Sequence, residues 1–283
     1  MDKDCPAIEP IVEGIYKERA EEEEDIFVTN EEAMLLKDKS AMLIVVDVNL
    51  PAMTECPELL KSVSTIVVLD HHRQNNETIK NAVVSYVEPY ASSTCEMVAE
   101  ILQYIVDKPK LKNIEADAMY SGILVDTDNF VIKAGVRTFE AAAFLRRAGA
   151  DVTRVRKMFR EDMEHCRIRT SIINKAEIYM DEFAISLFDG ENVSGATVVG
   201  AKAANALLNI QGIRGSFVLT ALQDCVYVSA RSIDELNVQV IMEKFGGGGH
   251  LTMAAAQLKD VTLEEAKRQL EEVLRQMRED GDI

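Results

Sequence analysis

The stretch Thr65–Arg73, TIVVLDHHR, runs four apolar residues into an aspartate, two adjacent histidines and an arginine. Two other stretches, Met42–Asp47 (MLIVVD) and Tyr120–Asp126 (YSGILVD), also end an apolar run with an aspartate. Unbroken Val/Ile/Leu runs are typical of parallel strands that are buried on both faces, and ligands of open α/β sheets bind at the carboxyl ends of such strands. We therefore expect three strands that end in Asp47, Asp70 and Asp126 and together form one polar site.

A single aspartate after an apolar run is usually only a turn residue at the end of a strand. Here the pattern occurs three times, and one instance carries two of the four histidines in the chain. Carboxylate and imidazole ligands together suit manganese, zinc or iron. The sequence therefore predicts a divalent metal site.

Composition limits the class of protein. The chain has 283 residues, of which 47% are hydrophobic, and this is enough for two domains with their own cores. A formal net charge of −17 argues against binding nucleic acid through broad basic coverage. The five cysteines lack CxxC spacing, and no apolar run approaches the roughly 20 residues of a membrane span. We expect a soluble cytoplasmic region with reduced thiols.

The first half of the chain reads as alternating strands and helices. Residues 82–87 (AVVSYV) predict a further strand, and Ser93 with Glu96 forms a capping-box pair at the start of a helix. Another helix is expected from an N-cap at Thr138 to a stop at Gly149. The charged stretch from Thr153 to about Asp181 predicts one long linker helix.

The second half has shorter strands that are separated by turns. We expect strands at 183–188, 216–222 and 225–229, with a hairpin turn at Gln223 and Asp224. Four consecutive glycines precede His250, and their backbone amides are suited to approach a phosphate group. The last helix, from a cap at Thr262, carries an apolar stripe that is expected to be core or an interface.

The motif DHH followed later by GGGGH resembles the DHH phosphoesterase superfamily. The strings VEPYASST (87–94), DTDNF (126–130), RTFEAAAFLRRAGAD (137–151), SARS (229–232) and GGGGHLTMAAAQL (246–258) are most similar to the catalytic region of GdpP-type cyclic-di-AMP phosphodiesterases. The resemblance implies an α/β fold in which a parallel-sheet DHH domain is joined by a linker helix to a smaller mixed α/β substrate-binding domain. The corresponding limits are residues 1–155, 156–182 and 183–283.

The resemblance also implies roles for individual residues. Asp47 corresponds to a ligand that bridges two manganese ions, and His71 and Asp126 to ligands of the second ion. Asp70 and His72 are expected to support these ligands and to contact the phosphate during catalysis. The nucleotide is expected to contact a set of residues in the second domain: Arg231, Ser232, Gly246, Gly247, Gly248, Gly249 and His250.

The implied activity is manganese-dependent hydrolysis of cyclic-di-AMP to the linear dinucleotide pApA by a metal-activated water. Two alternatives remain open: a phosphoesterase for very short RNA or pApA, and a non-catalytic module that binds cyclic dinucleotides. The expected ligand is a cyclic dinucleotide or a short adenine oligonucleotide. Duplex nucleic acid and membrane contact are not expected, and a homodimer is left open.

The chain departs from the family pattern at two places. Val48–Pro51 replaces the usual threonine, histidine and lysine-proline after the first aspartate, and this puts a substrate contact in doubt. The family's first motif, a histidine and proline with a D-x-D pair, has no counterpart. We therefore expect a fragment of a membrane-anchored parent or a shortened relative, which binds at most one Mn²⁺ weakly and has low activity.

Overall fold

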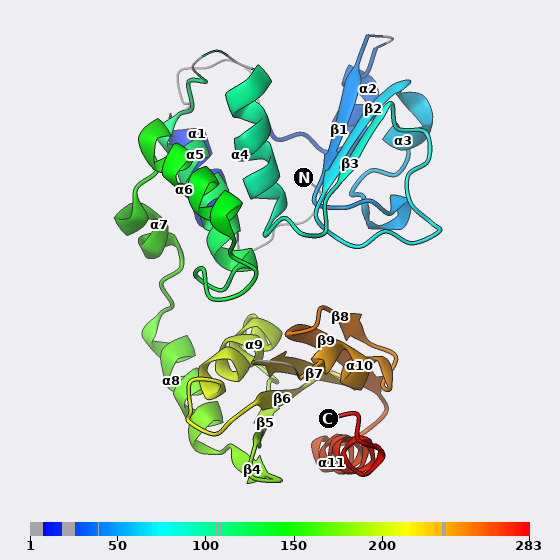
Figure 1. Cartoon of the computed structure of the whole chain (residues 1–283), viewed down its shortest axis with the longest axis vertical. Coiled ribbons are helices and arrows are strands. Elements are labelled where there is room, and N and C mark those ends of the chain that lie inside the picture. Colours follow the sequence, from blue (N-terminus) through cyan, green and yellow to red (C-terminus); the bar gives the residue numbers. More distant parts are fainter. Residues whose placement is uncertain (1–7, 19–25, 39, 106, 108, 234–235) are drawn as a thin grey trace. The chain divides into compact units, whose positions relative to one another are not determined.

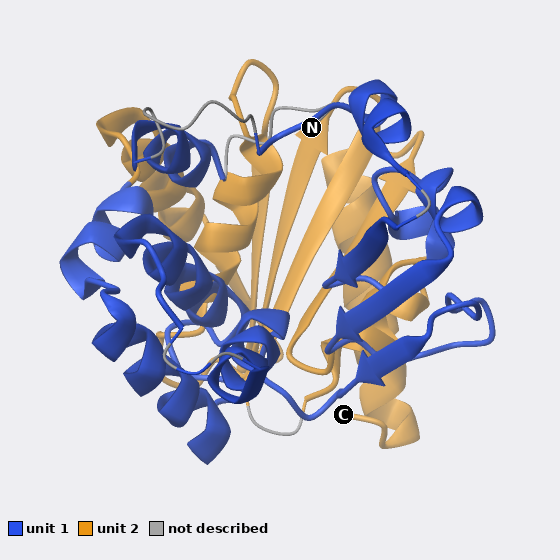
Figure 2. Cartoon of the chain, turned by 90° about the horizontal axis from the view of Figure 1, so that it is seen from above, with its two compact units in different colours: residues 1–160 blue, residues 161–283 orange. Residues whose placement is uncertain are grey.

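The computed structural model describes residues 8–18, 26–38, 40–105, 107, 109–233 and 236–283. The chain forms two compact units, unit 1 (Met1–Arg160) and unit 2 (Glu161–Ile283), which Figure 2 shows in different colours. Across these described ranges, every helix is too short or too polar to cross a membrane.

Unit 1 contains a three-stranded parallel sheet in the order β1-β2-β3 (Figure 1). The strands are β1 (Met42–Val46), β2 (Thr65–Asp70) and β3 (Val84–Val87). A 3₁₀ turn at Pro51–Met53 and the short helix α3 (Leu59–Ser62) connect β1 to β2. The expected parallel strands at 42–47, 65–70 and 82–87 are therefore confirmed.

The two faces of this sheet differ in burial. The face toward α3 holds a core cluster formed by Val45, Leu60, Ile66, Val68 and Ile79. On the opposite face Met42, Ile44 and Val46 of β1 are 59%, 54% and 50% exposed. The expectation that both faces are buried is therefore not met within the described residues. An unbroken apolar run makes both faces apolar, but the described elements cover only one of them.

The rest of unit 1 is helical. The helices are α1 (Glu9–Glu18), α2 (Asn30–Leu36), α4 (Thr94–Ile105), α5 (Asn113–Asp126), α6 (Val136–Ala148) and α7 (Val152–Met158). Helices α4 to α7 share a core in which Ile123, Leu145 and Val155 are fully buried. The start of α4 agrees with the expected cap, because the Ser93 hydroxyl accepts a hydrogen bond from the Glu96 N–H at 3.0 Å.

The expected strand at 120–126 is wrong, because these residues form the last two turns of α5. A short apolar run does not distinguish a buried strand from a buried helix, and only the full 14-residue length of α5 settles the question. Asp126 is still the last residue of its element, so its carboxylate still lies at an element end.

Two helix limits also differ from expectation. The N-cap of α6 is Gly135 and not Thr138, whose buried hydroxyl accepts a hydrogen bond from the Gly135 N–H at 3.0 Å. The single helix expected from 153 to 181 is two helices, α7 and α8 (Met163–Asn174). Asp162 caps the start of α8 by accepting from the His165 N–H at 2.8 Å, so a new helix begins there. The stop at Gly149 is confirmed, with φ of 120°.

Unit 2 is built on a six-stranded sheet in the order β4-β5-β6-β7-β9-β8. The strands are β4 (Glu177–Tyr179), β5 (Phe183–Asp189), β6 (Gly215–Leu222), β7 (Cys225–Ser232), β8 (Gly248–Gly249) and β9 (Met253–Lys259). Only β5 and β6 pair in parallel. The three expected strands and the turn at Gln223 are confirmed, and the mixed α/β class holds for the whole chain.

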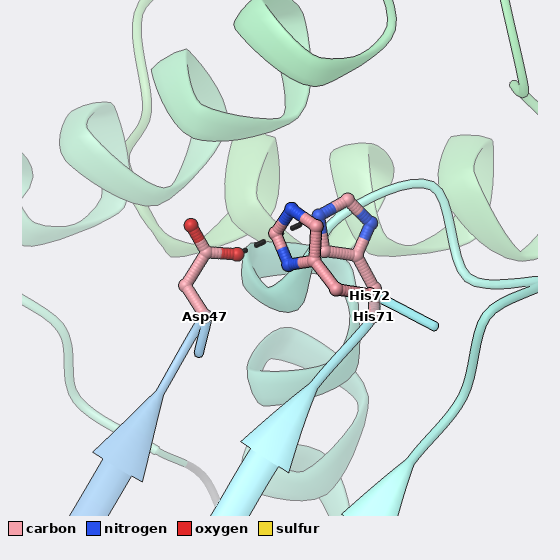
Figure 3. A group of neighbouring side chains, drawn as sticks. All are labelled: Asp47, His71 and His72. Atoms are coloured by element: carbon pink, nitrogen blue, oxygen red, sulfur yellow. Dashed lines mark ion pairs between the residues drawn. The ribbon is translucent and has the colours of Figure 1, made fainter. Parts of the chain in front are cut away.

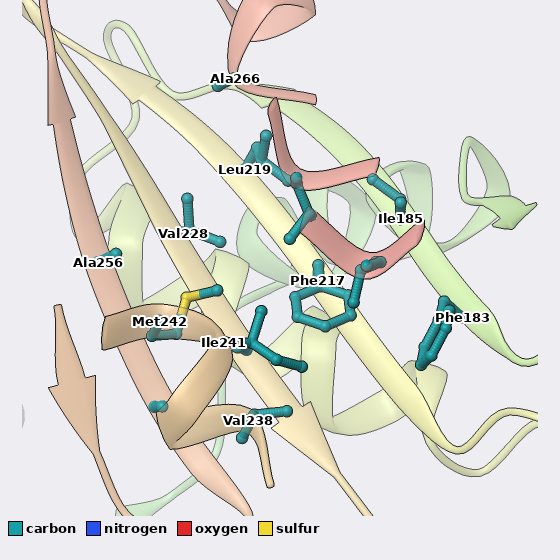
Figure 4. Packing of buried hydrophobic residues seen from close by; sticks show 14 of the residues in the cluster. Phe183, Ile185, Phe217, Leu219, Val228, Val238, Ile241, Met242, Ala256 and Ala266 are labelled. Atoms are coloured by element: carbon teal, nitrogen blue, oxygen red, sulfur yellow. The ribbon is translucent and has the colours of Figure 1, made fainter. Parts of the chain in front are cut away.

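Helices cover both faces of the sheet in unit 2. Helix α9 (Ala196–Leu207) and α8 pack on one face, and α10 (Val238–Glu243) and α11 (Leu263–Asp280) pack on the other. Figure 4 shows the second core, where Phe183 and Phe217 lie among residues of β7, α10 and α11. The apolar stripe of α11 is buried in this core, so it serves the fold of unit 2 and does not form an interface.

Candidate active site

The three expected metal ligands meet at one place in unit 1. Asp47 follows β1, His71 follows β2, and Asp126 ends α5. The Nε2 atom of His71 lies 3.5 Å from Asp47 Oδ1 and 3.8 Å from Asp126 Oδ2. The structure therefore brings together side chains from two strands and one helix.

Each of these two distances suits a pair of ligands of one metal ion. Ligand atoms at about 2.1 Å from a metal are about 3.0 Å apart when they bind at right angles and about 4.2 Å apart when they bind on opposite sides. The separations of 3.5 and 3.8 Å from His71 Nε2 fall between these limits. The ligand atoms of Asp47, His71 and His72 also lie within 4.8 Å of one another. The donor set of carboxylate oxygens and imidazole nitrogens thus fits a divalent cation.

Asp47 is held in an unusual backbone conformation. Its φ is +64°, in the left-handed region that non-glycine residues seldom adopt. The Asp47 N–H donates to the carbonyl of Leu69 at 3.0 Å, and the Thr94 hydroxyl donates to Asp47 Oδ1 at 2.9 Å. Strain of this kind persists where surrounding contacts determine the conformation, and it is common at functional sites. Here it directs the carboxylate toward His71.

The two histidines have different electrostatic environments, although they are adjacent (Figure 3). Burial lowers the pKa of His71, and the nearby His72 lowers it further. The hydrogen bond to Asp70 raises the pKa of His72. His71 is therefore kept neutral, which is the form that binds a metal, whereas His72 is biased toward carrying a proton.

Asp70 is hydrogen-bonded to His72 and fixes its position. Its carboxylate is fully buried and accepts from His72 Nδ1 at 2.8 Å and from the His72 N–H at 3.1 Å. Asn49 Nδ2 donates to the second oxygen of Asp70 at 2.6 Å. Burial opposes the ionisation of Asp70, but these donors outweigh it and keep its pKa below the ordinary value. Asp70 is thus a charged anchor that fixes Nδ1 of the His72 ring.

Negative charge is concentrated around the site. Burial raises the pKa of Asp126 to about 6, and the charge of Asp47 contributes to the shift. Burial also raises the pKa of the Cys95 thiol to about 12, with further contributions from Asp126 and Asp47. A cation bound beside Asp126 would stabilise the ionised form of this carboxylate.

The pKa of Asp126 predicts how metal affinity depends on pH. Because the carboxylate must lose its proton to bind a cation, Mn²⁺ affinity should fall by about tenfold per pH unit below pH 6. The raised pKa also affects the folding stability of the metal-free protein. Protonated Asp126 stabilises the folded state below pH 3.8, the pKa of this group in the unfolded chain, and this stabilisation is lost as the pH rises through 6. Mn²⁺ titrations at pH 5, 6 and 7 test the first expectation, and equal affinities at pH 5 and 7 would contradict it.

The structure changes the interpretation of Val48–Pro51. Asn49 is only 3% exposed, and its amide faces Asp70 and not solvent. A direct substrate contact by this side chain is therefore ruled out.

Sequence patterns did not single out Thr94 as a partner of Asp47, because the two residues are 47 positions apart and lie on different elements.

In unit 2 the expected nucleotide residues lie on β7 and on the glycine segment before β9. Arg231 Nε donates to Asn205 Oδ1 at 2.6 Å, and its Nη1 donates to the Ala230 carbonyl at 2.8 Å. Ser232 is 4% exposed, and its hydroxyl donates to the Leu236 carbonyl at 2.7 Å. The Ser232 hydroxyl is therefore bonded within the protein, and its expected contact with the nucleotide stays a prediction.

The four glycines differ in what the fold requires of them. Gly246 and Gly249 have φ of 71° and 146°, which favour glycine. A Cβ atom on Gly247 would lie 2.1 Å from the Ala255 carbonyl oxygen, whereas a Cβ atom on Gly248 would meet no atom within 4 Å. Backbone conformation or close packing thus requires glycine at positions 246, 247 and 249, whereas the Cβ position of Gly248 faces open space. His250 ends the segment, and its N–H donates to the Met253 carbonyl at 2.7 Å.

Comparison with known families agrees with this arrangement. Residues 7–123 match the DHH family, N-terminal domain, and residues 191–279 match the DHHA1 domain. The chain belongs to the DHH family. The metal-site residues Asp47 and His71 lie in the DHH match, and the glycine segment lies in the DHHA1 match.

Two curated relatives of this DHH family chain are phosphodiesterases by name. It is 45% identical over 244 residues to the cyclic-di-AMP phosphodiesterase PdeA of Listeria monocytogenes, covering 86% of the chain and 37% of PdeA. It is 40% identical over 257 residues to the cyclic-di-AMP phosphodiesterase GdpP of Bacillus subtilis, covering 90% of the chain and 39% of GdpP. The chain thus spans about two fifths of the length of these relatives.

A solved structure supports the fold of the DHH family chain. An exopolyphosphatase-related protein from Bacteroides fragilis superposes with a TM-score of 0.75 and 19% identity, covering 93% of the chain and 76% of that protein. At this level of identity the likeness concerns the fold alone.

Proposed function

We propose that this chain is the phosphodiesterase region of a protein that hydrolyses cyclic-di-AMP to pApA with the help of Mn²⁺. The observation that carries the proposal is the position of His71 Nε2, 3.5 Å from the Asp47 carboxylate and 3.8 Å from the Asp126 carboxylate, in a chain that is 45% identical to PdeA. The residues of this site are of the types that phosphoester hydrolysis by metal-activated water requires.

Each residue of the site has a distinct proposed role. Neutral His71 and the carboxylates of Asp47 and Asp126 would hold the cation, which would supply an activated water and neutralise charge on the phosphoryl oxygens. His72, oriented by Asp70, lies beside them with a raised pKa and is suited to donate a hydrogen bond to a phosphate oxygen. The adenine dinucleotide would be held through the DHHA1 domain, by Arg231 and the backbone of the glycine segment.

Single-turnover incubation tests the proposed function. Protein in excess over cyclic-di-AMP should form pApA slowly with Mn²⁺, and neither EDTA-treated protein nor His71→Ala should do so. Chromatography separates cyclic-di-AMP, pApA and AMP. If cyclic-di-AMP stays intact while pApA is cleaved to AMP, the function is that of a short-oligonucleotide phosphoesterase. If both nucleotides bind and neither is cleaved, the region is a binding module, and the proposal is wrong.

The role of the glycine segment gives a binding prediction. Gly248→Val should fold normally because a Cβ atom at this position meets no atom within 4 Å, but the side chain should block approach of a phosphate to the backbone. We expect a loss of about 2 kcal/mol, or roughly 30-fold in affinity for cyclic-di-AMP. Arg231→Ala should lose a similar amount through a missing charge-assisted contact.

Calorimetric titration with cyclic-di-AMP measures both losses. Arg275→Ala is a suitable control, because Arg275 forms only exposed ion pairs within α11, with Glu272 and Glu279. Its affinity should equal that of the unmodified protein. Unchanged affinity in both Gly248→Val and Arg231→Ala would remove the DHHA1 domain from the proposed binding site.

A further inference from the structure

Asn49 lies between the two segments that carry the metal-site residues of β1 and β2. It follows Asp47 by two positions and is 3% exposed. Its Nδ2 donates to Asp70 Oδ2 at 2.6 Å and to the His72 carbonyl at 3.4 Å. One buried amide therefore joins the segment after β1 to the segment after β2.

The backbone of Asn49 is fixed as well. Its carbonyl accepts from the Ile79 N–H at 2.9 Å, and Asp47 upstream is tied to the Leu69 carbonyl. Between these two anchors the chain passes through the left-handed conformation of Asp47, with φ of +64°. A non-glycine residue keeps such a conformation only where its surroundings determine it, and the bonds of Asn49 are part of those surroundings.

The amide of Asn49 can take only one orientation. Both of its neighbours, the Asp70 carboxylate and the His72 carbonyl, are hydrogen-bond acceptors, so the NH₂ group must face them. The other end of the amide, Oδ1, is then buried with no hydrogen-bond partner among the described residues. A buried acceptor without a hydrogen bond destabilises the folded state. The contacts of the NH₂ group must therefore outweigh this cost.

We propose that Asn49 is a positioning residue that sets the geometry of the metal centre and of His72, a role that rests on the function proposed above. Through Asp70 it fixes the His72 ring, and through its own backbone it holds Asp47 in the conformation that meets His71. It does not touch the substrate, because it is buried beneath the site.

The direct test is the variant Asn49→Leu, which keeps the branched shape at Cγ and removes both hydrogen bonds. In metal-free protein the ring-nitrogen NMR signals of His72 should shift, while those of His165 in unit 2 should stay in place. Mn²⁺ affinity should fall by about 10- to 100-fold, the usual range for a residue that orients metal ligands. The unfolding midpoint of each variant shows whether the fold is kept.

Asn81→Leu is the matched control. Asn81 also lies in unit 1, and its Nδ2 donates to the Leu60 carbonyl at 3.0 Å, away from the site. This variant should change neither the His72 signals nor the Mn²⁺ affinity. If Asn49→Leu does not fold, Asn49→Ala, which leaves room for water, takes its place.

One readout needs no variant. In the unmodified protein the side-chain amide protons of Asn49 should exchange with solvent more slowly than those of Asn81. Rapid exchange at Asn49, or unchanged His72 signals and Mn²⁺ affinity in a folded Asn49 variant, would overturn the proposal. The NMR readouts do not depend on hydrolysis. A protein that fails to cleave cyclic-di-AMP would therefore refute the proposed function, whereas the NMR signals and amide exchange would still decide the role of Asn49.

Discussion

Catalytic amounts of this chain are expected to leave cyclic-di-AMP nearly intact in the presence of Mn²⁺. Among the described residues, the ligand atoms of Asp47, His71 and His72 lie within 4.8 Å of one another, and Asp126 lies 3.8 Å from His71 Nε2. This set of side chains suits one cation. Hydrolysis with two ions clamps both the attacking and the leaving oxygen. Loss of one ion, at about 4 kcal/mol of transition-state stabilisation, should lower the rate by about a thousandfold.

Listeria PdeA, of which the chain covers 37%, is the reference for this prediction. Both proteins would be incubated with cyclic-di-AMP under the same conditions, and pApA would be quantified by chromatography over time. A rate within tenfold of PdeA would show that the chain assembles a complete catalytic centre and binds more than one ion.

Replacement of Gly247 by alanine should unfold or strongly destabilise unit 2. The new Cβ would lie 2.1 Å from the Ala255 carbonyl oxygen and 2.7 Å from Ala256 Cα, and both are backbone atoms that cannot move aside. The clash falls where the glycine segment packs against β9, whose Ala254 and Ala256 are buried in the core. We expect a loss of about 3 kcal/mol in the free energy of unfolding.

Gly248→Ala is the matched control, because its Cβ meets nothing within 4 Å. Its free energy of unfolding should stay within about 0.5 kcal/mol of the unmodified protein. Chemical denaturation of the two variants measures the difference. Equal stability of Gly247→Ala and Gly248→Ala would mean that the glycine segment does not pack against β9 as described.

The sequence correctly predicted those strands and turns that are marked by an apolar run or by turn residues. Residues 42–47 and 65–70 are strands, and the hairpin turn at Gln223 is present. The run at 120–126 misled because its apolar residues lie all around the helix, with Ile123 buried and Val125 58% exposed, so it lacks the one-sided period of a surface helix. Strand β9 was missed because its inward residues are mostly alanines, which have low strand propensity.

For the site, the DHH motif identified His71, His72 and Asp70, and the strand end identified Asp47. What escaped prediction were the residues that hold these groups in place. Thr94 reaches Asp47 from α4, and Asn49 reaches Asp70 across two strand ends. Such partners depend on how distant elements pack. The hydrogen bond from the Ser232 hydroxyl to the Leu236 carbonyl likewise could not be predicted from the motif.

The most direct test of the metal centre is a Mn²⁺ titration, followed by electron paramagnetic resonance, of the unmodified chain, His71→Ala and His72→Ala. His71 Nε2 faces both carboxylates, whereas His72 is bonded through Nδ1 to Asp70. The unmodified chain should bind about one ion at this site, His72→Ala should weaken binding by about 10- to 100-fold, and His71→Ala should weaken it more. If His71→Ala binds Mn²⁺ as the unmodified chain does, or better than His72→Ala, the metal centre described here is wrong.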